Sequence, residues 1–472
     1  MLFNSLVFLV FAAIFFSIWP WIKHRLQLRS AFLVAASFIF YGWWDWRFLF
    51  LIIASGLVDF SCALAIESYP RFKKFWLWIS LLANIGSLAI FKYCDFFIAN
   101  LNQAGSLFGW TLGISPLELI LPVGISFYTF QSMSYTIDVY RGEMKATRHI
   151  SHFFAYLSMF PQLVAGPIVR AKDLIPALEK NQPVSSEDLW IGLRWIVHGF
   201  FKKMVIADSF APAVAAAFES EAVVASATYW WLVVIMFAFQ IYCDFSGYSD
   251  IARGLGKWMG FEFPENFNHP YAAAGFRDFW SRWHMSLSTW FRDYVYLPLG
   301  GNRVSSGRAH FNMWFTMLVS GLWHGSAWTF VIWGALHAFY LSVERLTQWP
   351  KRLCAIPVVG RILAIAITFI LACIAWCFFR ANSAQQAFEV IGLLFSINSI
   401  NADLAIQRIG TFKLVLIGLV FVREGFFATS ACRSKIFETE WYANAKVGML
   451  ACVIIATILF RGPGHSFIYF QF

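Results

Sequence analysis

Residues 311–344 read FNMWFTMLVSGLWHGSAWTFVIWGALHAFYLSVE, a mostly apolar run. As one α-helix this run is about 51 Å long at 1.5 Å per residue, whereas the hydrocarbon core of a bilayer is about 30 Å thick. We therefore expect the run either to break near Gly321 or Gly325, with a second pass or a re-entrant excursion, or to continue into the cytoplasm. The loop that follows should be cytoplasmic because it carries Arg345, Lys351 and Arg352.

The whole chain shares this apolar character. Of its 472 residues 59% are hydrophobic and only 13% are charged, and the mean hydropathy is +0.62. These values lie outside the range of soluble domains. Because several runs reach the length of a transmembrane helix, the sequence predicts an all-α polytopic membrane protein with roughly ten to twelve transmembrane helices, together with re-entrant and interfacial helices. We expect a single membrane domain over residues 1–472.

The distribution of charge predicts the topology. The net charge of +10 does not indicate nucleic-acid binding, because Lys and Arg are spread over short loops, as the positive-inside rule expects of a bacterial inner-membrane protein. Residues 1–20 lack the basic start and the cleavage site of a signal peptide, so we expect a retained first span. Lys23, Arg25 and Arg29 follow this span and should be cytoplasmic. Alternation of the later loops then places both termini in the periplasm.

Two other segments mix apolar and polar residues. Residues 153–169 read FFAYLSMFPQLVAGPIV, and Pro161 and Pro167 favour a re-entrant segment over a simple span. Residues 229–252 end in a dense polar group, made of Gln240, Tyr242, Asp244, Ser246, Tyr248, Ser249 and Asp250. This group fits the interfacial end of a helix as well as it fits the lining of a cavity.

Charged residues and two histidines gather between Arg277 and Trp328. Charged groups are costly to bury in lipid, so by default they mark a site. His284 falls on an expected amphipathic helix, on which Asp278 and Arg282 are four residues apart and can pair. A membrane-surface helix accounts for this pattern as well as a functional site does.

His324 differs because it lies between Trp323 and Gly325 in an apolar run without neighbouring charge. A histidine within a span can make a hydrogen bond between helices. An imidazole that exchanges a proton near neutral pH is also a plausible general base, and the small residues around it leave room for a substrate.

Other kinds of chemistry lack a pattern in this sequence. The two histidines have no carboxylate or thiolate at ligand spacing, and the eight cysteines form no CxxC pair, so we expect no metal site. There is no GxSxG elbow, no Walker loop and no GxGxxG after a strand. We therefore expect neither a serine hydrolase nor a nucleotide-driven pump, and no bound cofactor.

Seven ordered motifs carry a resemblance to a known family. They are FPQLVAGPIVR (160–170), YCDFSGYSD (242–250), NFNHPY (266–271), FWSRWHMSLSTWFRDY (279–294), PLGGNR (298–303), LWHG (322–325) and FIYFQF (467–472). Together they resemble the membrane-bound O-acyltransferase (MBOAT) family in its alginate O-acetyltransferase branch. The similarity covers nearly the whole chain, with a motif-bearing core at about 118–345. His269 and Cys243 depart from it, since an aromatic residue is expected at these positions.

The resemblance implies a ring of membrane helices around a central funnel, and an O-acyltransferase activity. It makes His324 the catalytic histidine, which we assign as general base. It makes His284 the second histidine, which we assign to donor positioning or acid–base support. An acyl thioester is already activated, so the protein must mainly position it, exclude water and deprotonate a hydroxyl. Candidates for contacts to acetyl-CoA are Arg282, Arg292, Asp293 and Trp283.

The branch also implies a division of labour across the inner membrane. Acetyl-CoA is the donor in the cytoplasm, and this protein passes its acetyl group across the membrane. A separate periplasmic transferase, SGNH-like or esterase-like, then acetylates alginate or a similar exopolysaccharide. The C-terminal tail, residues 467–472, should lie outside. It is either an interfacial anchor, a docking contact for the partner or, through the hydroxyl of Tyr469, an acyl relay.

Two alternatives stay open. The acceptor can be peptidoglycan, because no residue distinguishes the glycans. In a different class, the chain can be a transporter or flippase, whose path polar residues and broken helices would line. Teichoic acid D-alanylation is less favoured because it uses a carrier-protein thioester.

Overall fold

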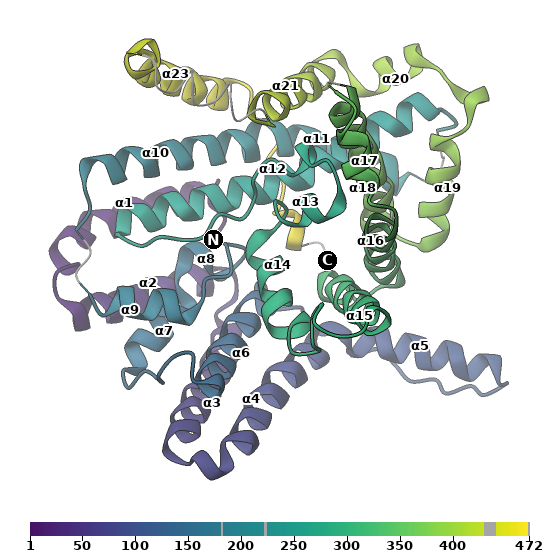
Figure 1. Cartoon of the computed structure of the whole chain (residues 1–472). Coiled ribbons are helices and arrows are strands. Elements are labelled where there is room, and N and C mark those ends of the chain that lie inside the picture. Colours follow the sequence, from purple (N-terminus) through teal and green to yellow (C-terminus); the bar gives the residue numbers. More distant parts are fainter. Residues whose placement is uncertain (181–182, 221–223, 358, 429–439, 471–472) are drawn as a thin grey trace. The chain divides into compact units, whose positions relative to one another are not determined.

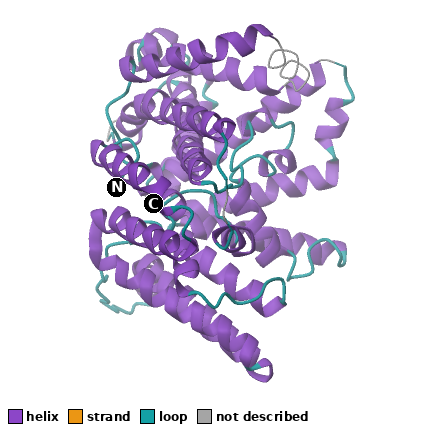
Figure 2. Ribbon diagram, turned by 90° about the vertical axis from the view of Figure 1, so that its left-hand side faces the viewer, coloured by secondary structure: helices purple, strands orange, loops and turns teal. Residues whose placement is uncertain are grey.

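The computed structural model describes residues 1–180, 183–220, 224–357, 359–428 and 440–470. Within these ranges the chain is helical and has no β-strand (Figure 2). The all-α class is thereby confirmed. The residues group into two compact units, Met1–Ile196 with Ile251–Pro264, and Val197–Asp250 with Glu265–Phe472. The single domain over residues 1–472 stays a prediction.

The helices are labelled in Figure 1. The first unit contains α1 (Leu6–Ile22), α2 (Leu26–Asp45), α3 (Leu49–Ser68), α4 (Lys73–Leu88), α5 (Cys94–Leu107), α6 (Ile125–Arg141), α7 (Ile150–Ser158), α8 (Phe160–Leu163) and α9 (Ala171–Leu178). Two helices contribute residues to both units, α10 (Ser186–Phe200) and α12 (Ala227–Met259).

The second unit contains the remaining helices. They are α11 (Asp208–Glu219), α13 (Phe276–Trp280), α14 (Met285–Phe291), α15 (Ser306–His324), α16 (Trp328–Thr347), α17 (Trp349–Cys354), α18 (Val359–Arg380), α19 (Ala384–Leu394), α20 (Ala402–Ile409), α21 (Thr411–Ala428) and α23 (Glu440–Leu459). A π-helical turn, η4 (Phe201–Ala207), joins α10 to α11, and a 3-10 turn, η8 (Ile468–Phe470), follows α23.

Several helices are suited to a membrane. Four described segments are long and apolar enough to cross a bilayer: Leu26–Ser68, Pro70–Leu107, Ala227–Met259 and Val359–Arg380. A fifth is formed if Ala402–Ile409 and Thr411–Phe426, which bend by 96° at their break, are one span. The chain is therefore a multi-pass membrane protein. This count is lower than the ten to twelve spans expected, because other helices are shorter or more polar.

A buried carboxylate joins three helices of the first unit. Asp59 on α3 is fully buried and accepts hydrogen bonds from Ser80 and Asn84 on α4 and from Ser132 and Thr136 on α6. A buried charge is tolerated only when it is paired or hydrogen-bonded. These four donors therefore fix α3, α4 and α6 to one another.

The segment 153–169 is interrupted, as expected. α7 ends at Ser158, and Met159 takes φ −51° and ψ 115° before α8 begins at Phe160. Pro161 lies in the first turn of α8, where its missing N–H costs no helical hydrogen bond.

The run 311–344 breaks close to the predicted glycine. α15 ends at His324 and α16 begins at Trp328. The two helices cross at very short distance, since a Cβ at Gly321 would lie 2.3 Å from the carbonyl oxygen of Phe330. Gly334 faces α15 in the same way. Small residues permit such close approach of membrane helices.

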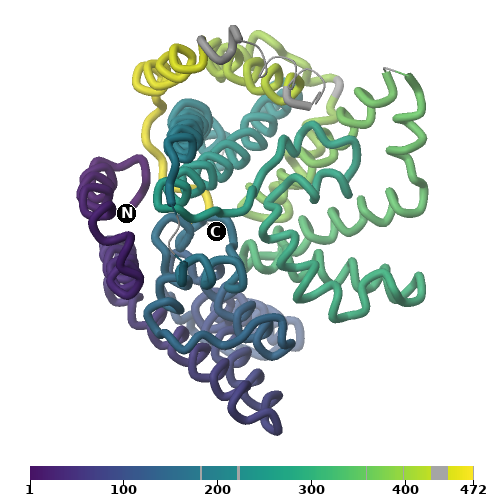
Figure 3. Tube along the Cα trace, turned by 60° about the vertical axis from the view of Figure 1, so that its left-hand side comes forward, coloured from purple at the N-terminus to yellow at the C-terminus, as the bar shows by residue number. Residues whose placement is uncertain are grey.

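The C-terminal segment returns to the interior of the second unit. Figure 3 traces it in yellow from α23 back to α12. The backbone N–H of Gly462 donates to the carbonyl oxygen of Met204 at 2.7 Å, and Phe467 and Ile468 are buried. The predicted tail 467–472 thus docks within its own unit up to Phe470, and Gln471 and Phe472 lie outside the described residues.

Candidate active site

His324 is the last residue of α15 and is 3% exposed. Gly325 leaves the helix with an extended backbone of φ −162° and ψ 154°. A Cβ at Gly325 would lie 2.1 Å from the ring of Phe330, so only glycine fits beside this histidine. The LWHG motif therefore both ends the helix and holds the imidazole at its end.

Aromatic rings surround His324. Its ring centroid lies 4.9 Å from those of Trp323 and Trp333 and 5.3 Å from that of Phe379. The phenol oxygen of Tyr469 lies 3.4 Å from its Nδ1. Burial raises the pKa of Tyr469, so the phenol is neutral, and it donates to Nδ1 in the histidine tautomer whose proton is on Nε2. The contact therefore joins a potential base to a hydroxyl.

His284 lies between two short helices. α13 ends at Trp280 and α14 begins at Met285, and His284 itself has a left-handed backbone with φ 41°. The expected amphipathic helix through Arg277 and His284 is therefore wrong. A left-handed residue cannot continue a right-handed helix, and a single sequence gives little sign of such a residue when it is not glycine.

The imidazole of His284 is oriented by an amide. It is fully buried, and its Nδ1 lies 3.1 Å from Oδ1 of Asn266. The same oxygen accepts from the hydroxyl of Ser286 at 2.9 Å, so Nδ1–H of His284 is a donor and its Nε2 carries the lone pair. Burial lowers the pKa of His284, which keeps the ring neutral.

Two aromatic residues lie between the histidines. The ring centroid of Trp323 lies 6.1 Å from that of His284 and 4.9 Å from that of His324. Phe245 on α12 lies 4.6 Å from His284 and 4.5 Å from Tyr469. The two predicted histidines, which are buried, and Tyr469, which is partly buried, are therefore parts of one cluster.

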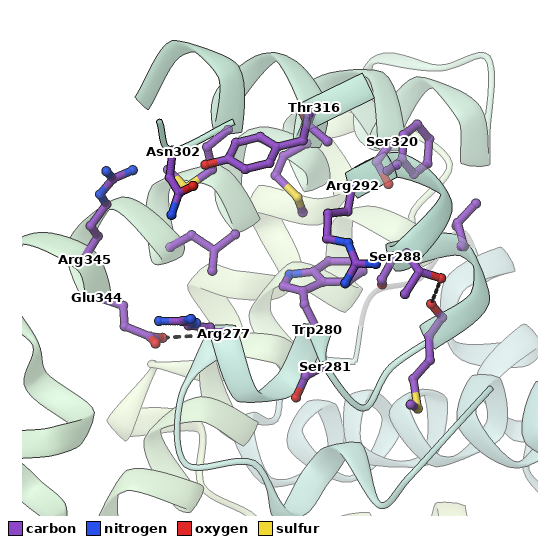
Figure 4. A pocket seen from close by; sticks show the side chains of 18 of the residues that line it. Arg277, Trp280, Ser281, Ser288, Arg292, Asn302, Thr316, Ser320, Glu344 and Arg345 are labelled. Carbon is purple, nitrogen blue, oxygen red and sulfur yellow. Dashed lines mark hydrogen bonds between the residues drawn. The ribbon is translucent and has the colours of Figure 1, made fainter. Parts of the chain in front are cut away.

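A cavity of about 960 Å³ lies in the same unit, and neither histidine is among its lining residues, although Met285 follows His284 and Ser320 lies four residues before His324. Its exposed lining carries four basic residues, here called the basic rim, which are Arg277, Arg292, Arg345 and Lys351. Figure 4 shows Arg277, Glu344 and Arg345 together at one side of the cavity. Glu344 accepts from the backbone N–H of Phe276 at 2.5 Å and of Arg277 at 3.3 Å, and burial raises its pKa.

Two buried residues of the cavity lining lie on the helix that ends at His324. Thr316 and Ser320 lie on α15, eight and four residues before His324, on the same face of the helix. Trp280 also lines the cavity, and its ring lies 5.8 Å from Trp333, which packs on His324. The cavity thus combines the exposed basic rim with a lining surface that is mostly apolar.

The residues that were predicted to contact acetyl-CoA differ in whether they line the cavity. Arg292 lines the cavity, and its Nε lies 2.8 Å from Oδ1 of Asp293. Arg282 pairs with Asp278 at 2.6 Å, as its spacing predicted, and it is not among the lining residues. Trp283 is 1% exposed and belongs to the aromatic core.

Sequence reasoning missed several residues of the site. Asn266 lies in the NFNHPY motif, but nothing in its spacing indicates that it orients His284. In the sequence, Arg345 and Lys351 indicate only a cytoplasmic loop. The folded chain brings them to the cavity on α16 and α17.

Comparison with known proteins agrees with this geometry. The sequence model of the membrane-bound O-acyltransferase family matches residues 145–384. The chain is 38% identical to the probable alginate O-acetylase AlgI of Pseudomonas aeruginosa, over 89% of this chain and 81% of that protein. It is 38% identical to the probable alginate O-acetylase AlgI of Azotobacter vinelandii, over 95% and 90%.

A relative that is named for a different acceptor is also similar. The peptidoglycan O-acetyltransferase of Helicobacter pylori is 35% identical, over 92% of this chain and 84% of that protein. The predicted resemblance is confirmed, and so is the enzyme class, which sets aside a transporter or flippase without acyl transfer. The chain belongs to the membrane-bound O-acyltransferase family and is an O-acyltransferase.

Proposed function

We propose that this protein takes an acetyl group from cytoplasmic acetyl-CoA and passes it across the inner membrane for O-acetylation of an extracytoplasmic polysaccharide. The cavity supports this proposal, because it combines the basic rim with Thr316 and Ser320, two buried residues of the helix that ends at His324. Both termini are proposed to be periplasmic, as the loop charges predict.

The chemistry of the cavity suits a coenzyme A thioester. Arg277, Arg292, Arg345 and Lys351 supply cationic donors for phosphate groups. The apolar interior suits the pantetheine arm and excludes water from the thioester. Asp293 holds the guanidinium of Arg292, and Arg282 and Trp283 would support this side of the site from outside the cavity.

His324 is proposed as the general base and Tyr469 as the first acceptor. Nδ1 of His324 takes the phenol proton while the phenol oxygen attacks the thioester carbonyl carbon. The carbon–sulfur bond breaks, the acetyl group stays on Tyr469 as an ester, and the thiolate leaves as the thiol with that proton. Neutral His284 would position the thioester or assist this proton transfer.

The acetyl group is then proposed to pass to a periplasmic SGNH-like or esterase-like transferase. The relatives named as alginate O-acetylases favour alginate or a similar exopolysaccharide as the final acceptor. Peptidoglycan is the second candidate, which the Helicobacter pylori relative favours. Deleting the gene and measuring ester-linked acetate separately on both polymers decides between them.

The test of the central step is acetyl release from radiolabelled acetyl-CoA by the purified full-length protein, with and without its periplasmic partner. His324→Ala should reduce turnover by roughly 100-fold or more, as expected for a missing general base. His310→Ala, a change on the same helix, serves as the control. Turnover that persists in His324→Ala at the parent rate contradicts the assignment.

A further inference from the structure

A carboxylate on α12 binds the main chain of the C-terminal segment. Asp244 is 2% exposed, and its Oδ2 accepts a hydrogen bond of 2.8 Å from the backbone N–H of Ile468. Its Oδ1 lies 2.8 Å from Nζ of Lys203. Since a buried charge requires compensating partners, the main chain of the tail is one of the groups that stabilise this carboxylate.

Lys203 extends the same contact. Its side chain is 10% exposed, and Nζ lies 2.9 Å from Oδ1 of Asp208. Nζ also donates to the carbonyl oxygen of His465 at 3.2 Å. The ionic cluster of Lys203, Asp208 and Asp244 therefore holds the segment by one carbonyl and, three residues later, by one N–H.

The residues that follow Asp244 hold the side chains of the tail. Phe245 packs against Phe467 at 5.7 Å and against Tyr469 at 4.5 Å between ring centroids. These two residues flank Ile468, whose N–H is bound by Asp244. A shift of the segment by one residue would replace Tyr469 at His324 by a residue without a hydroxyl.

We propose that Asp244 is a positioning residue of the transfer reaction, which sets the register of the C-terminal segment and so places the Tyr469 hydroxyl at Nδ1 of His324. Asp244 acts through the main chain of Ile468 and through Lys203. This inference rests on the proposed function, because the register matters for catalysis only if Tyr469 accepts the acetyl group.

The experiment measures docking of the tail separately from activity. A cysteine at position 468 (Ile468→Cys) keeps the backbone N–H and replaces a side chain that is 1% exposed. Its rate of reaction with a water-soluble maleimide is followed on the peptide that contains residue 468, in the full-length protein in membranes. Asp244→Ala should raise this rate at least about tenfold, since it removes a charge-assisted hydrogen bond.

Two variants control for loss of folding. Asp250→Asn breaks another ion pair of α12, a partly buried one in which Oδ2 lies 2.6 Å from Nζ of Lys202, and should leave the labelling rate unchanged. Asp244→Asn keeps an acceptor for the N–H and should raise the rate less than Asp244→Ala. If Asp244→Ala does not accumulate in the membrane, Asp244→Asn decides the question by the same comparison with Asp250→Asn.

Acetylation completes the test. With the native Ile468, Asp244→Ala should lower polysaccharide acetylation at least about tenfold while acetyl-CoA binding stays within about twofold. An unchanged labelling rate overturns the inference, and so does faster labelling with full acetylation. A Tyr469→Phe variant that still acetylates overturns the proposed acceptor instead, whatever the labelling shows.

Discussion

The phenol oxygen of Tyr469 lies 3.4 Å from Nδ1 of His324, although 145 residues separate the two in sequence. The contact brings the tail of the chain to the end of α15. It places the C-terminal motif FIYFQF beside the LWHG motif. The first prediction concerns the hydroxyl of Tyr469.

Tyr469→Phe should abolish transfer of acetyl to the polysaccharide while the protein stays in the membrane. Phenylalanine keeps the packing against Phe245 and removes only the atom that would carry the acetyl group. Ester-linked acetate on the secreted polymer is the measurement. Tyr248→Phe, at a buried tyrosine that packs on Phe467, is the matched control and should acetylate normally. Removing residues 467–472 should match Tyr469→Phe, and normal acetate in either variant would refute the relay.

The basic rim should set the affinity for the donor. Arg345→Ala with Lys351→Ala should raise KM for acetyl-CoA by roughly 10-fold with little change in kcat, because exposed phosphate contacts bind substrate and transition state alike. The effect should shrink at high salt, which screens exposed charges. Steady-state kinetics at two ionic strengths test this. Arg352→Ala removes an exposed arginine on α17 that does not line the cavity, and it should keep the parent KM. An equal rise in KM for this variant would mean that the net positive charge, and not the basic rim, sets the affinity.

Asn266→Ala should reduce kcat and stability together. The change removes the acceptor that orients Nδ1–H of His284 and leaves a buried donor unsatisfied, at a cost of about 1–3 kcal/mol. Thermal unfolding in detergent and turnover of acetyl-CoA are the two measurements. Ser286→Ala keeps that acceptor and removes another donor to it, so its effect should be smaller. Because burial already keeps His284 neutral, the shape of the pH–rate profile above pH 6 should not depend on His284; a profile altered there by Asn266→Ala would contradict this.

Gly321→Ala should destabilise the pair α15–α16. The added methyl would lie 2.3 Å from a backbone carbonyl oxygen, and overpacking of this kind costs about 1–3 kcal/mol. Gly307→Ala, on the same helix with open space around it, should be neutral or slightly stabilising. Comparing the thermal midpoints of the two variants tests the prediction, and equal midpoints would speak against a close crossing.

The sequence predicted what depends on composition and local pattern. Helical class, the break beside Gly325 and the interruption in 153–169 follow from apolar length and from glycine or proline positions. Arg282 and Asp278 form the ion pair that their spacing of four predicts, although α13 ends at Trp280, before Arg282.

What the sequence did not predict depends on the three-dimensional packing. His284 does not continue the expected helix because its backbone is left-handed, and no residue pattern here predicts that conformation. Asn266 reaches His284 from another element, and Ile468, whose N–H binds Asp244, lies 224 residues further along the chain. Such contacts form only when separate helices pack together.

The face of α15 that carries Thr316, Ser320 and His324 has a further consequence. These residues mark a straight line of about 12 Å, at 1.5 Å per residue. The arm of a thioester that lies along this line must match its length. If the donor binds as proposed, an acetyl group on a shorter thiol would reach His324 only by leaving the basic rim, or would stay too far out while the donor holds the rim. The helix would then act as a ruler that selects donors by the length of their arm.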